Sequence, residues 1–165
     1  MMSLFKKKET RIFITSDTHF CHTNIMKYTN RPMSWEDIVI GNWNKTISNN
    51  DTVIHVGDFS FGGIDNVKKY LNKLNGNKIL VRGNHDGYTN LAYMKAGFIF
   101  SCDEFVYGNT LFTHEPVFIK IKGISVNIHG HIHNIDVQKT IDKHKCMRYT
   151  NVCIDLNNLT PVRFI

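Results

Sequence analysis

Two spacings of apolar residues alternate in the first half of the chain, and this alternation restricts the possible folds most. The β-branched runs RIFITS (11–16), DTVIHV (51–56) and NKILVR (77–82) are typical of buried strands. Between them, segments 34–47 and 64–74 place their apolar residues at helical spacing. Strands that alternate with helices predict a βαβ arrangement.

The second half of the chain is richer in strands. A short helix is expected at 88–96, and six strand segments then follow, at 98–101, 103–108, 109–114, 124–130, 151–156 and 162–165. We therefore predict an α/β fold that continues as mostly antiparallel β structure. No repeat, low-complexity tract or linker marks a boundary, so we expect one domain over residues 1–165.

Polar side chains follow five of the expected strands, at the point where each strand ends. They are Asp17 and His19 after the first run, Asp58 after the second, Asn84, His85 and Asp86 after the third, and then His114, His131 and His133. In such sheets ligands bind outside the carboxyl ends of the strands, and glycines in these segments allow sharp turns. Because neighbouring strands lie about 4.8 Å apart, the strand ends can supply ligands for two metal ions in one pocket.

Three histidines stand at alternate positions in NIHGHIHNID, residues 127–136. His129 lies inside a strand pattern, as His55 does, so we interpret both as core residues or supports behind the ligands. His131 and His133 follow the strand, and we interpret them as metal ligands.

Composition limits the class of protein. With 42% hydrophobic and 21% charged residues, the chain is typical of a globular protein. No run approaches the ~18 consecutive apolar residues that span a bilayer. The apolar stretch within the N-terminal MMSLFKKKETR is too short for a signal peptide. Four cysteines without a C-x-x-C pair fit reduced thiols. We therefore predict a cytoplasmic protein with no membrane partner.

The net charge of +6 favours anionic partners such as nucleotides or nucleic acid. The lysines, however, are scattered along predicted helices and loops, as is typical of a solvated face. Charge alone therefore indicates no dedicated nucleic-acid site.

The ordered set D-x-H, G-D, G-N-H-D, H and G-H-x-H resembles the calcineurin-like metallophosphoesterase superfamily. SDTHFCHTNI (16–25), GDFSFGG (57–63) and VRGNHD (81–86) are similar to its small, cap-less bacterial and phage members. The resemblance spans residues 12 to about 156. It implies a four-layer α/β/β/α sandwich and a metal-dependent phosphoesterase. The expected substrates are small nucleotide-like phosphodiesters, with monoesters as a second class.

The resemblance also implies a ligand set for two divalent metal ions. Asp17, His19 and His133 hold one ion, Asp58 bridges to the other, and Asn84, His114 and His131 complete the second site. Mixed nitrogen and oxygen ligands suit Mn, Fe, Zn or Ni and disfavour Ca, and we expect Mn first. Two such ions lower the pKa of a water between them, which generates hydroxide, and neutralise phosphoryl oxygens.

Further residues are expected at the reacting phosphate. His85 resembles the catalytic histidine of the family, and Asp86 is expected to orient or charge it. Arg31 and Arg82 are candidate phosphate clamps, although Arg82 could instead anchor the sheet edge. His22 is expected to contact the phosphate, with a surface or supporting role as the alternative.

Two other functions compete with a small-substrate phosphoesterase. A nuclease of this family carries extra DNA-binding segments, for which 165 residues leave no space. A metal-binding scaffold lacks the catalytic histidine, which is present here as His85.

Phe61 departs from the family pattern, because many members have Asp or Asn three residues after the G-D aspartate.

Overall fold

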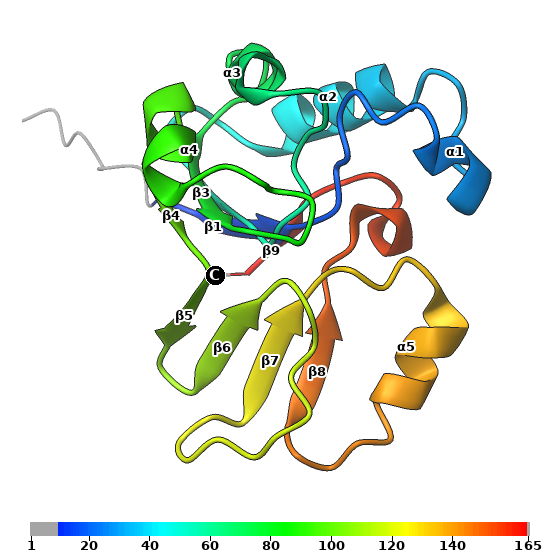
Figure 1. Cartoon of the computed structure of the whole chain (residues 1–165), viewed down its shortest axis with the longest axis vertical. Coiled ribbons are helices and arrows are strands. Elements are labelled where there is room, and N and C mark those ends of the chain that lie inside the picture. Colours follow the sequence, from blue (N-terminus) through cyan, green and yellow to red (C-terminus); the bar gives the residue numbers. More distant parts are fainter. Residues whose placement is uncertain (1–9, 165) are drawn as a thin grey trace, which may run out of the picture.

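A computed structural model describes residues 10–164, which fold into four stacked layers in the order α/β/β/α (Figure 1). The α/β class and the layer order agree with the expectation from the family resemblance. The interpretation of the N-terminal segment falls mainly on residues 1–9, outside the described part of the chain.

The first sheet has the strand order β4-β3-β2-β1-β9, and all of its pairs are parallel except β1–β9. Its strands are β1 (Ile12–Thr15), β2 (Thr52–His55), β3 (Asn77–Val81), β4 (Phe100–Cys102) and β9 (Val162–Arg163). Its helices are α1 (Ile25–Tyr28), α2 (Trp35–Thr46), α3 (Ile64–Leu71) and α4 (Asn90–Ala96). The predicted βαβ alternation is confirmed, whereas the short α1 was not expected.

The second sheet has the strand order β5-β6-β7-β8, and the prediction of mostly antiparallel pairing is wrong. Its elements are β5 (Glu104–Tyr107), β6 (Thr110–Thr113), β7 (Val126–His129), α5 (Ile135–Ile141) and β8 (Arg148–Asn151). Only β5–β6 is antiparallel. A long loop before β7, and α5 before β8, return the chain to the starting edge, as parallel pairing requires.

The segment 151–156 was expected to be a strand, and this prediction is also wrong except at Asn151, the last residue of β8. Cys153 forms a single parallel bridge with Ser16, and a 3₁₀ helix, η1 (Ile154–Asn157), follows at once. The backbone N–H of Ser16 donates to Val152 O at 3.0 Å, and that of Val152 donates to His129 O at 2.8 Å. These bonds join the two sheets at the carboxyl ends of β1 and β7.

Three apolar cores fill the spaces between the four layers. The largest lies between α1–α4 and the first sheet, where Trp43 and Phe20 are completely buried. The second lies between the sheets and includes Ile14, Phe112 and Ile128. The third is smaller and packs Ile141, on α5, against the outer face of the second sheet. Alternate residues of a buried strand face opposite sides, so Phe13 enters the first core and Ile14 the second.

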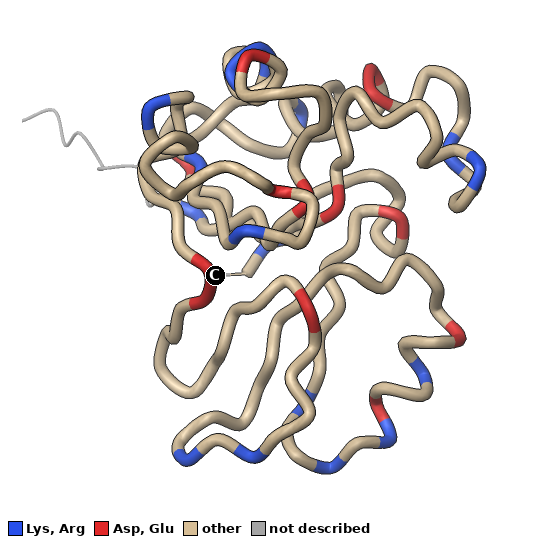
Figure 2. Tube along the Cα trace, in the orientation of Figure 1, with Lys and Arg blue, Asp and Glu red and all other residues tan. Residues whose placement is uncertain are grey.

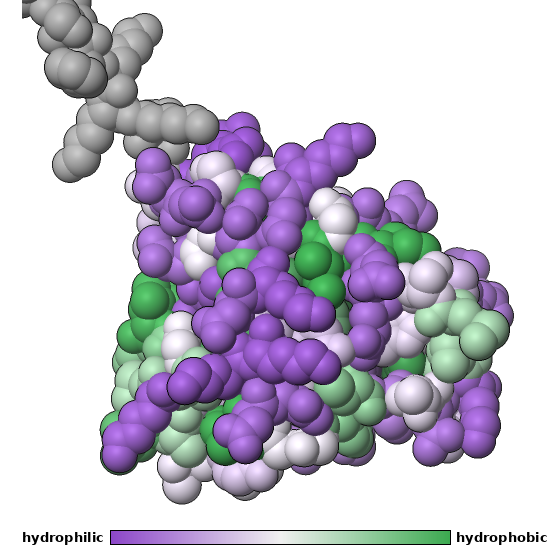
Figure 3. All heavy atoms as spheres, turned by 90° about the horizontal axis from the view of Figure 1, so that it is seen from above, coloured by the Kyte–Doolittle hydropathy of each residue, from purple (hydrophilic) through white to green (hydrophobic). Residues whose placement is uncertain are grey.

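The distribution of charged residues differs between the helical layer formed by α1–α4 and the second sheet. Basic and acidic residues are mixed over the helical layer, whereas basic residues gather at the lower end of the second sheet (Figure 2). Seen from above, the helical layer presents mostly hydrophilic residues to solvent (Figure 3). Within residues 10–164, no helix is both long and apolar enough to cross a bilayer.

We predict that Asp51→Asn destabilises the fold through the start of β2. The buried Asp51 carboxylate accepts from Arg11 Nε at 3.1 Å and Ser48 N at 2.8 Å, and the hydrogen bond from Arg11 lowers its pKa. We expect the free energy of unfolding at pH 7 to fall by about 1–2 kcal/mol in urea titrations. A lowered pKa gives stability that is present above the unfolded pKa of ~3.9 and is lost as pH falls towards the folded pKa, so the deficit should shrink below about pH 4.

The exposed Glu115 provides the control, and Glu115→Gln should leave the unfolding curve unchanged. An Asp51→Asn deficit that stayed constant down to pH 2.5 would contradict the ionic origin of this effect.

Candidate metal centre

The loops that follow β1 and β2 run side by side and carry the first candidate ligands. The N–H of Asp17 donates to Gly57 O at 2.9 Å, and the N–H of His19 donates to Asp58 O at 3.0 Å. The parallel register of β1 and β2 therefore continues beyond the strands and aligns the two loops. Asp17 and Asp58 reach the same place because each follows its strand by a few residues.

Glycines at three strand ends allow the backbones to approach closely. A Cβ on Gly57 would lie 2.3 Å from His114 Nδ1, one on Gly83 2.2 Å from Asp58 Oδ1, and one on Gly130 2.4 Å from Asp17 Oδ2. Only Gly57 has a positive φ, of 90°, so the expected sharp turn applies to that glycine. Gly83 and Gly130 are needed because no side chain fits between the strand ends.

Four candidate ligands adopt left-handed backbone conformations that non-glycine residues rarely occupy. Their φ angles are 59° for Asp17, 51° for His19, 57° for Asp58 and 65° for His131. Each such residue costs on the order of 1 kcal/mol, so the surrounding structure must hold it in place. Strain gathered on one cluster of side chains indicates a functional site.

Asp86 supplies part of this support. Its buried carboxylate accepts from the N–H groups of Asp58 and Gly83, both at 2.8 Å, and of Phe59 at 3.2 Å. Burial raises its pKa to about 6, with a smaller contribution from Asp58, although these N–H groups oppose the shift. Both oxygens are thus engaged by the backbone, which favours a role in fixing Asp58 over the predicted orientation of His85.

Two carboxylates and three imidazoles meet between the sheets. Asp17 Oδ1 lies 3.5 Å from His133 Nε2, 3.8 Å from His19 Nε2 and 4.0 Å from His114 Nε2. Asp58 Oδ2 lies 3.3 Å from His114 Nε2 and 3.6 Å from His19 Nε2. Asp17 therefore belongs to two groups with metal-ligand spacing, one with His19 and His133, the other with Asp58 and His114. Asp58 was the expected bridge, and its contact with both His19 and His114 keeps that role open.

The donor atoms of this cluster fit metal ions. Both ring nitrogens of His19 and the Nε2 of His114 are buried and make no hydrogen bond. A buried polar atom without a partner is rare, and here the Nε2 atoms of His19 and His114 face carboxylate oxygens across 3.3–4.0 Å. This spacing leaves room for cations with mixed nitrogen and oxygen ligands.

The protonation of the imidazoles is consistent with this fit. Burial lowers the pKa of His19 to about 3, so its ring is neutral, as a metal ligand must be. Burial also lowers the pKa of His114, but Asp58 and Asp17 raise it, and the result is about 9. Without a metal, a proton on His114 thus balances the carboxylates, and a cation would replace that proton.

The remaining expected ligands lie beside this cluster. Asn84 Oδ1 is 3.1 Å from His131 Nδ1, and the His131 ring centroid is 5.2 Å from that of His114. Asn84, His114 and His131 are thus brought together, as expected for the second ion. His85 donates its N–H to Asp58 Oδ1 at 2.9 Å, while its side chain is exposed at the edge of the cluster.

Residues 10–156 match the calcineurin-like phosphoesterase family. The chain belongs to this family.

Two proteins are similar to this chain over nearly its whole length. The uncharacterized protein MJ1445 of Methanocaldococcus jannaschii is 30% identical over 161 residues, which cover 92% of this chain and 86% of the relative. The structure of AQ665 from Aquifex aeolicus, a protein of unknown function, has a TM-score of 0.74 at 25% identity and covers 94% of this chain and 96% of its own.

A nuclease of Pseudomonas putida, MPE, is more distant. It has a TM-score of 0.54 at 19% identity, with 74% of this chain and 62% of the nuclease covered. At this identity the likeness shows the fold alone.

Asp155 is a residue of the candidate metal centre that sequence reasoning missed. Its Oδ2 lies 2.5 Å from His133 Nδ1, which turns the Nε2 of that ring towards Asp17. The carbonyl of Val56 holds His114 in the same way, at 2.8 Å from Nδ1. Ligating histidines commonly bond a carboxylate or carbonyl through the other nitrogen, so an unassigned Asp after a β-branched run was the available signal.

The structure places Arg31 behind the cluster of candidate ligands, which favours a supporting role over the predicted phosphate clamp. Its buried guanidinium donates to both oxygens of Asp155 at 2.7 Å, to Asp17 O at 2.6 Å and to Thr18 O at 2.8 Å. Arg31 therefore fixes the loop of Asp17 and the carboxylate that holds His133.

Arg82 and His22 occupy different surroundings. The Arg82 side chain bonds Asp103 and the Tyr88 carbonyl, which favours the alternative of an anchor at the sheet edge. His22 stacks on Phe61 with a centroid separation of 4.0 Å, and the His85 ring lies 4.9 Å from the same Phe61. His22 thus borders the site, where a phosphate contact remains a prediction.

The buried histidines His55 and His129 lie in the strands as expected. His55 Nε2 is 3.0 Å from Thr18 Oγ1, and His129 Nδ1 is 2.8 Å from Gly130 O. Both are completely buried and support the loops that carry the candidate ligands.

We predict that Asp155→Asn lowers the affinity for Mn by about 10–100-fold, because His133 loses the carboxylate that orients it. Isothermal titration calorimetry on metal-free protein measures the change. Asp142→Asn, on an exposed carboxylate after α5, is the matched control and should bind Mn like the unaltered chain. Equal affinities for both variants would show that Asp155 does not act on the metal site.

Proposed function

We propose that this protein hydrolyses phosphodiester bonds of small nucleotide-like substrates, and monoesters less efficiently, with two divalent transition metal ions, Mn first among them. The convergence of buried, unpartnered imidazole nitrogens with two carboxylates at the joined ends of both sheets carries the proposal. Family membership supports phosphoester chemistry, and the donor set supports the metals.

Seven side chains would hold the ions. They are Asp17, His19, Asp58, Asn84, His114, His131 and His133. When bound, two such cations lower the pKa of a water between them and neutralise phosphoryl oxygens. Arg31, Asp86 and Asp155 fix the ligands in place, so that little reorganisation is needed when substrate binds.

His85 is the candidate proton donor to the leaving oxygen. Its backbone is fixed by Asp58, and its ring lies against Phe61 at the exposed edge of the cluster. This position lets the imidazole reach a bound phosphoester without coordinating an ion. A positioned acid typically contributes 10²–10⁴ in rate.

The charges around the site favour a diester over a monoester dianion. Arg31 is committed to Asp155 and backbone carbonyls, and Arg82 to Asp103, so neither guanidinium is free to neutralise a second negative charge. A groove of about 490 Å³ borders His133 between α1, α5 and η1, with walls that include Tyr28, Asn30 and Ile135. It offers space for the remainder of a nucleotide-like substrate.

The proposal predicts a separation of metal binding from turnover. His85→Ala should bind about two equivalents of Mn, as the unaltered protein does, and lose roughly 10²–10⁴ in kcat. Asp58→Asn should lose metal as well as activity. Metal analysis after reconstitution and steady-state kinetics measure these effects. Full activity of His85→Ala would refute its role, and full activity of metal-free protein would refute the two-metal proposal.

A second prediction concerns substrate class. With Mn, kcat/KM should be higher for bis(p-nitrophenyl) phosphate than for p-nitrophenyl phosphate, because a diester carries less negative charge. Parallel kinetics on one preparation test this. A higher kcat/KM for the monoester would make the protein a phosphatase first and leave the metal assignment intact.

A further inference from the structure

Within the described residues 10–164, the net positive charge is concentrated in one part of the fold. Residues 117–149 contain six Lys or Arg and only two Asp or Glu. The other described residues, 10–116 and 150–164, contain eleven of each and are balanced. Seen along the sequence the lysines look scattered, but the fold brings this group to the lower end of the second sheet (Figure 2).

Two segments form this basic end, the loop of residues 117–124 before β7 and residues 142–148, which are the loop before β8 and the first residue of that strand. They lie side by side, because Tyr149 Oη donates to Val117 O at 3.0 Å and Cys146 Sγ contacts Phe118 O at 3.2 Å. The N–H of Arg148 also donates to Ser125 O at 2.9 Å. Both loops therefore lie at the starting ends of β7 and β8, opposite the ends that carry His131 and the joined loops of the metal centre.

The cations of the basic end are free to bind a partner. Within residues 10–164, five of them are exposed and form no ion pair: Lys120, Lys122, Lys143, Lys145 and Arg148. Lys139, on α5, is different, because it pairs with Asp136. Four of these cations lie on the two adjacent loops and Arg148 begins β8 beside them, and together they make a surface that attracts a polyanion.

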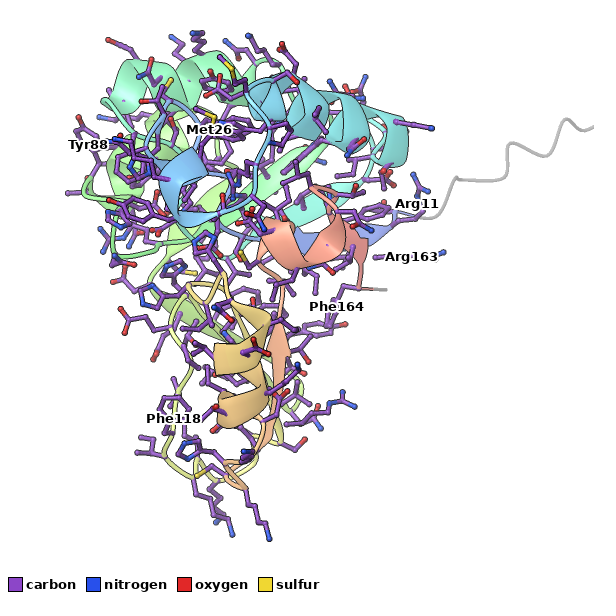
Figure 4. All side chains as sticks on the ribbon, turned by 90° about the vertical axis from the view of Figure 1, so that its right-hand side faces the viewer. Arg11, Met26, Tyr88, Phe118, Arg163 and Phe164 are labelled. Atoms are coloured by element: carbon purple, nitrogen blue, oxygen red, sulfur yellow. The ribbon has the colours of Figure 1, made fainter. Side chains whose placement is uncertain are left out.

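Aromatic side chains stand among these cations. Phe118 is 44% exposed, and its ring centroid lies 4.6 Å from that of His144, also exposed. The ring of Tyr149 backs Phe118 at 5.7 Å and holds it at the surface. In Figure 4, Phe118 lies at the lower end of the molecule, far from Tyr88 and Met26 on the helical side.

We propose that the basic end, formed by the 117–124 and 142–148 segments, binds single-stranded nucleic acid. Lysines would contact the phosphates, and Phe118 with His144 would stack on a base, the combination that serves sequence-tolerant single-strand binding. An anionic membrane is the less suitable partner. Only Phe118 and Ile119 are exposed large apolar side chains in the two loops, whereas five cations surround them. The inference goes beyond hydrolysis, because it requires neither metal nor turnover.

Fluorescence anisotropy with a labelled oligodeoxynucleotide of about 15 nucleotides tests the proposal in EDTA, where no metal-dependent cleavage occurs. Each neutralised phosphate contributes about −0.7 to the slope of log K against log salt, so five contacts predict a slope near −3.5. The double variant Lys120→Ala/Lys122→Ala should make this slope less negative by about 1.4. Phe118→Ala should weaken binding by roughly 5–100-fold without changing the slope.

Lys45→Ala/Lys68→Ala, on exposed lysines of α2 and α3, is the matched control and should leave affinity and slope unchanged. Circular dichroism checks that each variant is folded. Equal losses in the control pair would overturn the proposal, as would an unaltered protein that binds no oligonucleotide at 50 mM salt. Binding to phosphatidylserine vesicles without binding to the oligonucleotide would assign the surface to a membrane instead. Because every arm is metal-free, these outcomes are independent of the proposed hydrolysis.

Discussion

The close approach of Asp17 and Asp58, with three imidazoles around them, is the constraint on which the rest of the structure depends. Two buried carboxylates repel each other, and the fold offsets this with N–H donors from distant segments. His131 donates to Asp17 Oδ2 at 3.0 Å and His85 donates to Asp58 Oδ1 at 2.9 Å. Each donor belongs to a loop that also carries another candidate ligand. The segments that stabilise the charges are therefore the same ones that complete the site.

This arrangement requires both sheets, which is why the bridge between Ser16 and Cys153 matters. It brings the end of β1 beside the chain that leaves β8, and so sets His133, which Asp155 holds, against Asp17. The glycines at 83 and 130 complete the approach, because a side chain at either position would occupy the place of a carboxylate oxygen. The left-handed conformations of the ligand residues are stable only because these contacts are made together.

Sequence patterns predicted those elements whose structure depends on residues close together in the sequence. The β1–β3 strands, α2 and α3 follow from apolar spacing, and the polar residues at strand ends were visible as motifs. The parallel pairing of β6, β7 and β8 was missed because crossover connections, not strand composition, set strand direction. Asp155 was missed, and the surroundings of Arg31 were not foreseen, for a related reason. Their roles arise from a contact across 124 residues, which no short motif reveals.

The placement of positive charge follows from the same electrostatics. Lysines beside a metal centre would repel its cations and weaken metal binding. Lysines that bind a polyanion are therefore better placed at a distance from the metal centre. β7 has four residues, Val126–His129, and so separates the basic end from the ligand loops by roughly 13 Å, more than the Debye length of about 8 Å at physiological salt. Yet the loop before β7 follows His114 and α5 follows His133, so two connections run from candidate ligands to the basic end. One small fold can thus keep a phosphate-binding surface and a metal site electrostatically separate while the same segments build both.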